Sequence, residues 1–412
     1  MTTLATAGTS FTLGRRASFW VSAAVVGHTL WTSAAPACTY PLYAAQWHLT
    51  PTVITSIFAV YPITVVAALL LFGNLSDQIG RRATMLLGLA ASLLGVLLFA
   101  AAPSVAWIFI GRFFMGVGVG LSTSPATAAL VEFSAAGQSE RANAVATIAT
   151  AVGLAAATLI GGGLIQYAPF PTHLNFWVLF AVLAMLFGAT WLLPRHAAID
   201  GAARWRPGAV SVPKSIRWPF AISAVAVTGG YALGALFLSL GTQVAHDLIG
   251  SANALVNGAA IALFATVTGA VTLAAKRLSA NASIVLGGLS SATGMGLLAL
   301  SANNHSLPVF LVGLAFGGAA YSLQFRGGLT MINASASPAH RAGTLSAIFL
   351  IGYLLMGAIA MALGISATAW GLRAAIDVGA PGIGLIGLLG VVLVAWNVRL
   401  PVRAPVAAPC LR

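Results

Sequence analysis

The chain has 412 residues, of which 59% are hydrophobic and only 6% are charged. Soluble globular proteins carry about 25% charged residues, so this composition excludes a set of soluble domains and predicts an all-α integral membrane protein in a lipid bilayer. The formal net charge of +13 does not indicate nucleic-acid binding, because the basic residues lie in short segments between apolar runs.

Apolar runs long enough to span a membrane recur along the whole chain. A helix that spans a membrane needs about 20 mostly apolar residues. Division at charges, prolines and polar clusters predicts twelve helices, at residues 18–45, 52–75, 83–102, 105–131, 141–168, 173–194, 217–245, 252–275, 281–302, 306–332, 340–369 and 374–398. The first run is longer than the 7–15 apolar residues typical of a signal peptide, so it is predicted to be retained. Cys38 and Cys410 are not expected to form a disulfide.

Twelve helices place both termini on one side of the membrane. All of the 19 Lys and Arg residues except Arg112, Arg326 and Arg373 then fall on that side. Short cytoplasmic loops carry an excess of Lys and Arg. The sequence therefore predicts cytoplasmic termini, in the inner membrane of a bacterium.

The sequence predicts two repeated halves. The first is a six-helix bundle at 1–194, and the second is a six-helix bundle with a short tail at 217–412. A basic cytoplasmic linker at 195–216 joins them. At an offset of 200 residues, Arg141-Ala142 matches Arg341-Ala342, and Gly118 matches Gly318. Duplicated six-helix halves are a transporter plan in which the substrate binds between the halves near the membrane midplane.

The segment between the second and third predicted helices, residues 73–82, resembles the signature loop of the major facilitator superfamily, G-x-L-a-D-r-x-G-r-k/r. Six of its positions match that pattern: Gly73, Leu75, Asp77, Gly80, Arg81 and Arg82. Gln78 departs from it. The resemblance implies the family's fold, two pseudo-symmetric bundles of six helices each, and transport by alternating access.

The resemblance also implies a conformational latch on the cytoplasmic side. Asp77 would face the positive N-terminus of the eleventh helix, near Arg341, a contact worth about 0.3–1 kcal/mol. Gly73 would let another helix approach closely, and Arg81 would pair with Glu132. The predicted latch, which biases one of two conformations, comprises Gly73, Asp77, Gly80, Arg81, Arg82, Glu132, Arg141 and Arg341. The alternative is that the arginines merely follow the positive-inside rule.

Residues 109–120 resemble the family's fourth-helix motif, an intramembrane arginine followed by glycines. Arg112 at mid-membrane would cost about 2.5–3.5 kcal/mol, so it is expected to face a cavity or a partner, with snorkelling as the alternative. The fifth helix only partly resembles the antiporter motif of drug exporters. Ala157 and Thr158 replace that motif's glycine and proline.

The remaining intramembrane polar residues predict a substrate cavity. His28, Trp31 and Thr32 share one face of the first helix, and Tyr231 stands 200 residues after Trp31. The predicted cavity comprises His28, Trp31, Thr32, Arg112, Tyr231, Tyr321, Gln324 and Arg326. Such an aromatic lining with few hydrogen-bonding groups suits a moderately apolar solute. The alternative role for these residues is helix packing.

No carboxylate lies near the centre of a predicted helix, although many proton-coupled members of the family have one there. His28 is therefore the candidate for proton coupling, because the ordinary pKa of histidine is about 6.5.

The predicted function is secondary active transport of a small organic solute by a monomer that is not an enzyme and has no cofactor or metal. Export of a drug or metabolite, with protons as a candidate coupling ion, is favoured. An uptake symporter or facilitator for a sugar or organic acid is the alternative. The alternative from a different class of protein is a membrane-embedded sensor or enzyme. The sequence has no metal-binding or nucleophile pattern that would indicate an enzyme. It also has no soluble signalling domain that would indicate a sensor.

Overall fold

A computed structural model of the protein describes residues 12–135, 137–194 and 210–399. Most of the predicted linker (195–209) and the tail with Cys410 (400–412) lie outside the described residues. Within the described ranges every regular element is helical.

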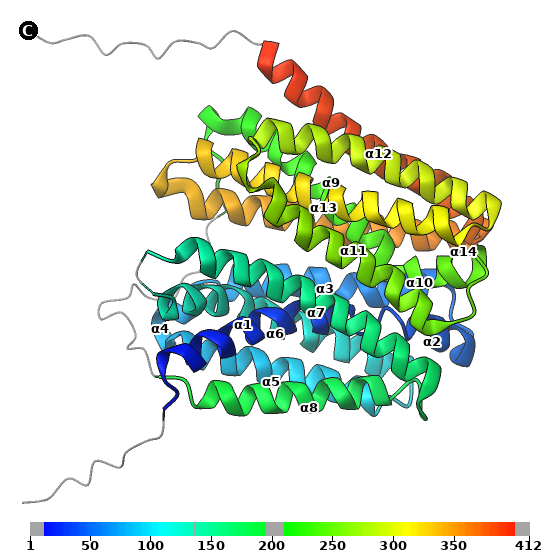
Figure 1. Ribbon diagram of the computed structural model, residues 1–412, viewed down its shortest axis with the longest axis horizontal. Helices are drawn as coiled ribbons and strands as arrows, with labels where there is room; N and C mark the ends of the chain where they lie inside the picture. The colour runs from blue at the N-terminus through cyan, green and yellow to red at the C-terminus, as the bar shows by residue number, and fades with distance from the viewer. Residues whose placement is uncertain (1–11, 136, 195–209, 400–412) are drawn as a thin grey trace, which may run out of the picture.

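The N-terminal half contains six long helices, each matching one predicted span. They are α1 (Arg15–Ala34), α3 (Pro51–Phe72), α5 (Arg81–Ala100), α6 (Val105–Phe133), α7 (Ser139–Tyr167) and α8 (Leu174–Trp191). Two short helices, α2 (Tyr40–Trp47) and α4 (Leu75–Ile79), lie at opposite ends of this half (Figure 1). The predicted span 18–45 is interrupted because Pro36 has no backbone N–H, so α1 ends at Ala34 and the chain turns before α2.

The C-terminal half repeats the plan with five helical runs. They are α9 (Arg217–Ser239), α11 (Ala254–Ala274), α12 (Ala280–Asn304), α13 (Leu307–Ser335) and α14 (Pro338–Arg399). Short helical segments flank them: η1 (Lys214–Ile216), α10 (Gly241–Gln243), the π-helical η2 (Val244–Leu248) and η3 (Ala275–Arg277).

Helix α14 makes two passes although it is continuous by hydrogen bonding. Gly371 interrupts it with φ 89° and ψ 156°, a conformation in the left-handed half of φ space that glycine adopts without a steric penalty. The two arms match the predicted spans 340–369 and 374–398. Counted in this way, the described residues contain the twelve predicted spans, which confirms the predicted all-α membrane fold.

Ten of the helical segments are long and apolar enough to cross a bilayer, and α1 is not among them. Its serines, threonines and His28 lower its hydropathy, but most of these polar residues are buried among other helices. A helix at the centre of a bundle need not be apolar on the faces that contact protein.

The two halves lie side by side, the N-terminal half in blue to green and the C-terminal half in green to red (Figure 1). Helix α3 packs on α14, and α7 packs on α11, across the boundary. We call the end of the molecule that holds α4 the α4 end, and the opposite end, which holds α2 and α10, the α10 end.

The closest contacts between the halves lie at mid-helix or toward the α10 end. Gly258 of α11 lies against the carbonyl of Thr158 in α7, and Gly364 of α14 lies against Thr55 in α3. The hydroxyls of Thr52 and Thr368 are 2.8 Å apart. Small residues let helix backbones approach closely in this way. The α10 end is therefore closed.

Candidate functional site

Two arginines of the signature loop tie the N-terminal half together. Arg81 Nη1 lies 2.6 Å from Glu132 Oε1, at the start of α5 and the end of α6. Arg82 donates to the carbonyl oxygen of Leu193 over 2.9 Å and lies over the ring of Trp191. A partly exposed ion pair of this kind contributes about 0–1 kcal/mol to stability. Both contacts lie within one half, so they do not by themselves join the halves.

Gly80 sets the direction of α5. Its φ of 86° and ψ of 152° lie in a region that other residues avoid, and the helix begins at the next residue. The carbonyl oxygen of Gly80 accepts from the amide of Thr84 over 3.2 Å, which starts the helical hydrogen bonds. This turn positions Arg81 and Arg82 toward α6 and α8.

The residues expected to meet the eleventh span make no such contact in this conformation. Asp77 is exposed, and its carboxylate has no hydrogen-bond or ion-pair partner within the described ranges. The atoms nearest to a side chain at Gly73 belong to Leu69 of the same helix in this conformation, so the close approach of another helix stays a prediction.

The two repeat-related arginines also lie at the surface of the α4 end. Arg141 is exposed and donates to Gln138 Oε1 over 3.2 Å, at the start of α7. Arg341 is exposed in the first turn of α14. Their role in a latch stays a prediction.

Arg112 is buried rather than snorkelling, with 1% of its surface exposed. It donates to the carbonyl oxygen of Ser33 in α1 over 2.8 Å. Its guanidinium carbon lies 4.7 Å from the ring centroid of Tyr61 and 5.7 Å from that of Phe58 in α3. The charge is stabilised by a carbonyl and by two aromatic faces, so Arg112 joins α6 to α1 and α3.

The predicted face of α1 carries polar atoms without partners. His28 is 3% exposed, and its Nδ1 lies against the carbonyl oxygen of Val25. His28 Nε2, Trp31 Nε1 and Thr32 Oγ1 are buried and have no hydrogen-bond partner within the described chain. Buried polar atoms normally find a partner. Three such atoms on one helical turn therefore identify this face of α1 as a candidate site.

An aromatic cluster forms at mid-helix depth where the halves meet. Ring centroids of Tyr231 (α9) and Tyr353 (α14) are 4.7 Å apart, those of Tyr231 and Phe325 (α13) 5.6 Å, and those of Tyr321 (α13) and Phe325 6.0 Å. Helix α3 of the N-terminal half, which carries the buried Tyr61, packs against α9 and α14. We call Tyr61, Tyr231, Tyr321, Phe325 and Tyr353 the aromatic cluster.

Phe325 and Tyr353, two members of the aromatic cluster, could have been found from the sequence. Tyr353 stands four residues after Phe349, and the same spacing separates Tyr321 from Phe325, so each pair shares one face of its helix. Tyr321, Phe325 and Tyr353 are only half-buried. Part of the surface of each of these side chains is therefore uncovered.

The other two predicted cavity residues lie against neighbouring helices instead. Gln324 Nε2 donates to the carbonyl oxygen of Gly287 in α12 over 3.1 Å. Arg326 donates to the carbonyl oxygens of Leu278 over 3.1 Å and Lys276 over 2.5 Å, beyond the C-terminal end of α11. These contacts are those of residues that join helices, and they correspond to the packing alternative.

Comparison with protein families agrees with this architecture. The family described as Major Facilitator Superfamily matches residues 20–361. The chain belongs to this superfamily. It is an integral, multi-pass membrane protein that transports small solutes and is not an enzyme.

Solved structures show the same fold at low sequence identity. The nucleoside transporter NupG has a TM-score of 0.73 and 12% identity, covering 92% of this chain and 100% of that one. The xylose transporter XylE from E. coli, in a partially occluded inward open conformation, has a TM-score of 0.72 and 14% identity, covering 94% and 99%. A bacterial homolog of the human lysosomal transporter Spinster, in an inward-facing and occupied conformation, has a TM-score of 0.67 and 11% identity, covering 92% and 96%. A comparison with curated protein sequences finds no match.

Proposed function

We propose that the protein is a secondary active transporter that exports a drug-like or metabolite solute by alternating access. The observation that carries this proposal is the aromatic cluster. Each of its members lies near the middle of its helix, and both halves contribute to it. A site shared between the halves at this depth can be exposed to either side of the membrane as the halves rock.

The contacts between the halves support a state that is closed at the α10 end. The unengaged Asp77 at the α4 end fits the same state, because its contact with the start of α14 would form only when that end closes. By the positive-inside rule the α4 end faces the cytoplasm, so this conformation accepts a solute from inside the cell. We further propose a monomer in the bacterial inner membrane with cytoplasmic termini.

The chemistry of the cluster favours an amphipathic or aromatic solute. Tyrosine rings offer apolar faces, and their hydroxyls offer a few hydrogen bonds. Arg112 donates to the carbonyl oxygen of Ser33 and lies against two rings, but its buried Nε has no partner within the described chain and offers a donor to a polar or anionic group of the solute. Uptake of a polar metabolite is the second candidate, because tyrosine hydroxyls also suit sugars and because the structural neighbours include nucleoside and xylose transporters.

Solute binding and flux test this proposal together. Solutes are screened for thermal stabilisation of the purified protein, and those that stabilise it are tested for flux in proteoliposomes with an imposed pH gradient. We expect an amphipathic solute to move against its own gradient, and Tyr231→Ala to reduce that flux about tenfold or more. Stabilising solutes that are never transported would instead favour a sensor. Flux that only equilibrates would favour a facilitator.

His28 is the proposed proton-coupling residue, because its Nε2 is buried and unpaired on the candidate face of α1. His28→Ala is expected to abolish flux driven by a pH gradient while exchange of solute at equal pH persists. His48→Asn is the matched control, since His48 is exposed and has a left-handed conformation that asparagine tolerates. Intact pH-driven flux in His28→Ala would remove His28 from the mechanism.

A further inference from the structure

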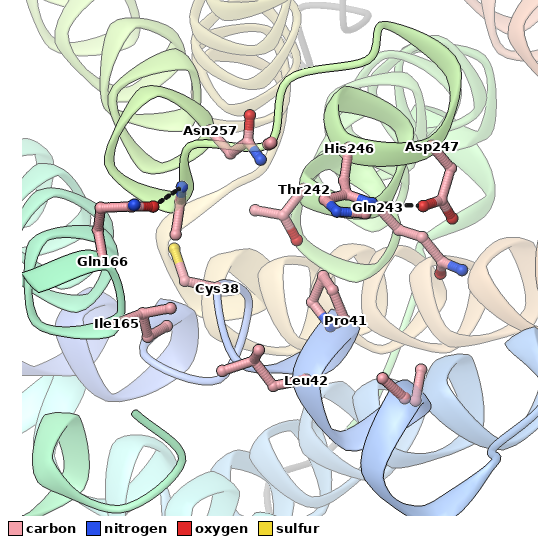
Figure 2. A pocket seen from close by; sticks show the side chains of 14 residues that line it. Cys38, Pro41, Leu42, Ile165, Gln166, Thr242, Gln243, His246, Asp247 and Asn257 are labelled. Carbon is pink, nitrogen blue, oxygen red and sulfur yellow. Dashed lines mark hydrogen bonds and ion pairs between the residues drawn. The ribbon is translucent and has the colours of Figure 1, made fainter. Parts of the chain in front are cut away.

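A pocket of about 470 Å³ lies between the two halves at the α10 end, apart from the aromatic cluster. From the N-terminal half it is lined by Cys38, which follows α1, by Leu42 of α2 and by Gln166 of α7. Thr242 of α10 and Asn257 of α11 line it from the C-terminal half (Figure 2). The volume lies within the range of about 300–1,000 Å³ that is typical of small-molecule sites.

Hydrogen bonds between the halves hold the walls of this pocket. Thr242 Oγ1 donates to the carbonyl oxygen of Ala37 over 2.7 Å. The amide of Ala254 donates to Gln166 Oε1 over 2.8 Å (Figure 2). Opening of the α10 end would separate these partners. The pocket therefore belongs to the closed state of this end.

The pocket has a polar wall that the fold itself does not fully use. Asn257 is 6% exposed, and its Nδ2 donates to the carbonyl oxygen of Ser251 over 3.0 Å, whereas its Oδ1 has no partner within the described ranges. The π-helical η2 presents His246 and Asp247, whose Nδ1 and Oδ1 are 2.6 Å apart. Short π-helical segments are often found at functional sites.

The charge of the lining selects the kind of ligand. Among the residues that the structure describes, no Lys or Arg lines the pocket, and Asp247 is the carboxylate in its lining. The buried Oδ1 of Asn257 adds an acceptor that has no partner within the described ranges. Pro41, Leu42 and Ile165 supply apolar walls. An ammonium group beside Asp247 with a short hydrocarbon body against these walls satisfies both features.

We propose that this pocket is a binding site for small organic ammonium compounds, distinct from the solute site in the aromatic cluster. Because both halves line it only while the α10 end is closed, an occupant stabilises that state. A ligand shifts a conformational equilibrium by its difference in affinity for the two states. This regulatory consequence rests on the proposed transport cycle, whereas the binding site does not.

Cys38 provides a reporter inside the pocket. Cys410→Ser leaves Cys38 as the single thiol of the chain, because the sequence contains two cysteines. We compare the rates at which two reagents modify Cys38, the cationic 2-aminoethyl methanethiosulfonate and the anionic 2-sulfonatoethyl methanethiosulfonate. Each rate is divided by the rate at which the same reagent reacts with a small thiol in solution. We expect about a tenfold preference for the cation, because one nearby carboxylate attracts the cation and repels the anion.

The preference should disappear in Asp247→Asn and persist in Asp377→Asn. Asp377 is the matched control, since it is exposed to a similar degree, 41% against 43%, and belongs to the same half, but does not line the pocket. Equal rates for the two reagents in the parent protein would overturn the proposal. So would a thiol that reacts with neither reagent while the unfolded protein reacts completely.

Protection of Cys38 then tests binding directly. Phenethylammonium at millimolar concentration should slow the reaction of Cys38 with neutral methyl methanethiosulfonate, and 2-phenylethanol, which lacks the charge, should not. Asn257→Leu should weaken protection about tenfold. Equal protection by the alcohol, or none by either compound, would overturn the ammonium site. Because no flux is measured, these outcomes are independent of whether the protein transports a solute.

Discussion

Arg112 illustrates how the charge of a single residue can be buried inside a membrane protein. Its guanidinium has a carbonyl oxygen from α1 on one side and two aromatic rings of α3 on the other. A hydrogen bond to a charged group is worth about 1.5–3 kcal/mol, and a cation–π contact about 0.5–2 kcal/mol. Arg112 therefore has enough contacts to offset much of the cost of its burial.

Arg112→Leu is expected to lower the free energy of unfolding by about 2–4 kcal/mol, because these contacts are lost together. Thermal unfolding of the purified protein measures the change. Arg16→Leu is the control, since Arg16 is exposed in the first turn of α1 and a surface substitution changes stability by about 0.5 kcal/mol or less. Unchanged stability together with lost solute binding would show that Arg112 contacts the solute instead.

Helices α3 and α14 form the boundary between the halves that can be tested most directly. Thr52 donates its backbone amide to Thr368 Oγ1 over 3.0 Å, and the two hydroxyls are 2.8 Å apart. Nearby, Ser56 donates its hydroxyl to the sulfur of Met361 over 3.3 Å. At this end of the two helices the contact is made by polar groups and by glycine. Such a contact can form and break in each cycle.

A disulfide across this boundary should lock the α10 end. In the variant Thr52→Cys, Thr368→Cys, with Cys410→Ser, oxidation is expected to reduce flux at least tenfold, and a reductant should restore it. The physical reason is that alternating access requires these helices to separate. Thr52→Cys alone is the control and should transport normally. Full flux in the cross-linked protein would show that α3 and α14 stay together throughout the cycle.

At the scale of the whole molecule, the proposed transport cycle requires the two ends of the bundle to alternate between closed and open states. The α10 end is closed here, and the Asp77 carboxylate at the α4 end has no partner in the described structure. A contact that is absent from one state and present in the other biases the equilibrium between them. Asp77 is therefore proposed to act in the conformation that this structure does not represent.

Asp77→Asn should reduce solute flux at least tenfold while leaving the thermal stability of the present state within about 0.5 kcal/mol, the range of a surface substitution. Flux in proteoliposomes and unfolding of the purified protein measure the two effects separately. Asp377→Asn, another exposed acid, should preserve both. Flux that survives in Asp77→Asn would contradict the latch.

The sequence by itself determined the number of spans, the two halves and the family, because the thickness of a bilayer sets the length of each apolar run and the signature loop is local. It also placed Arg81 and Glu132 at adjacent helix ends. Where a turn is governed by one residue, the structure can differ from the predicted span, as at Pro36, where α1 ends at Ala34.

Only the tertiary structure decided what each buried polar residue contacts. Arg112 bonds to α1, Gln324 bonds to α12, and Tyr353 joins a cluster that the sequence analysis did not include. Helical spacing shows which residues share a face, but it does not show which helix that face meets. That choice depends on how twelve helices pack together and on which end of the bundle is closed.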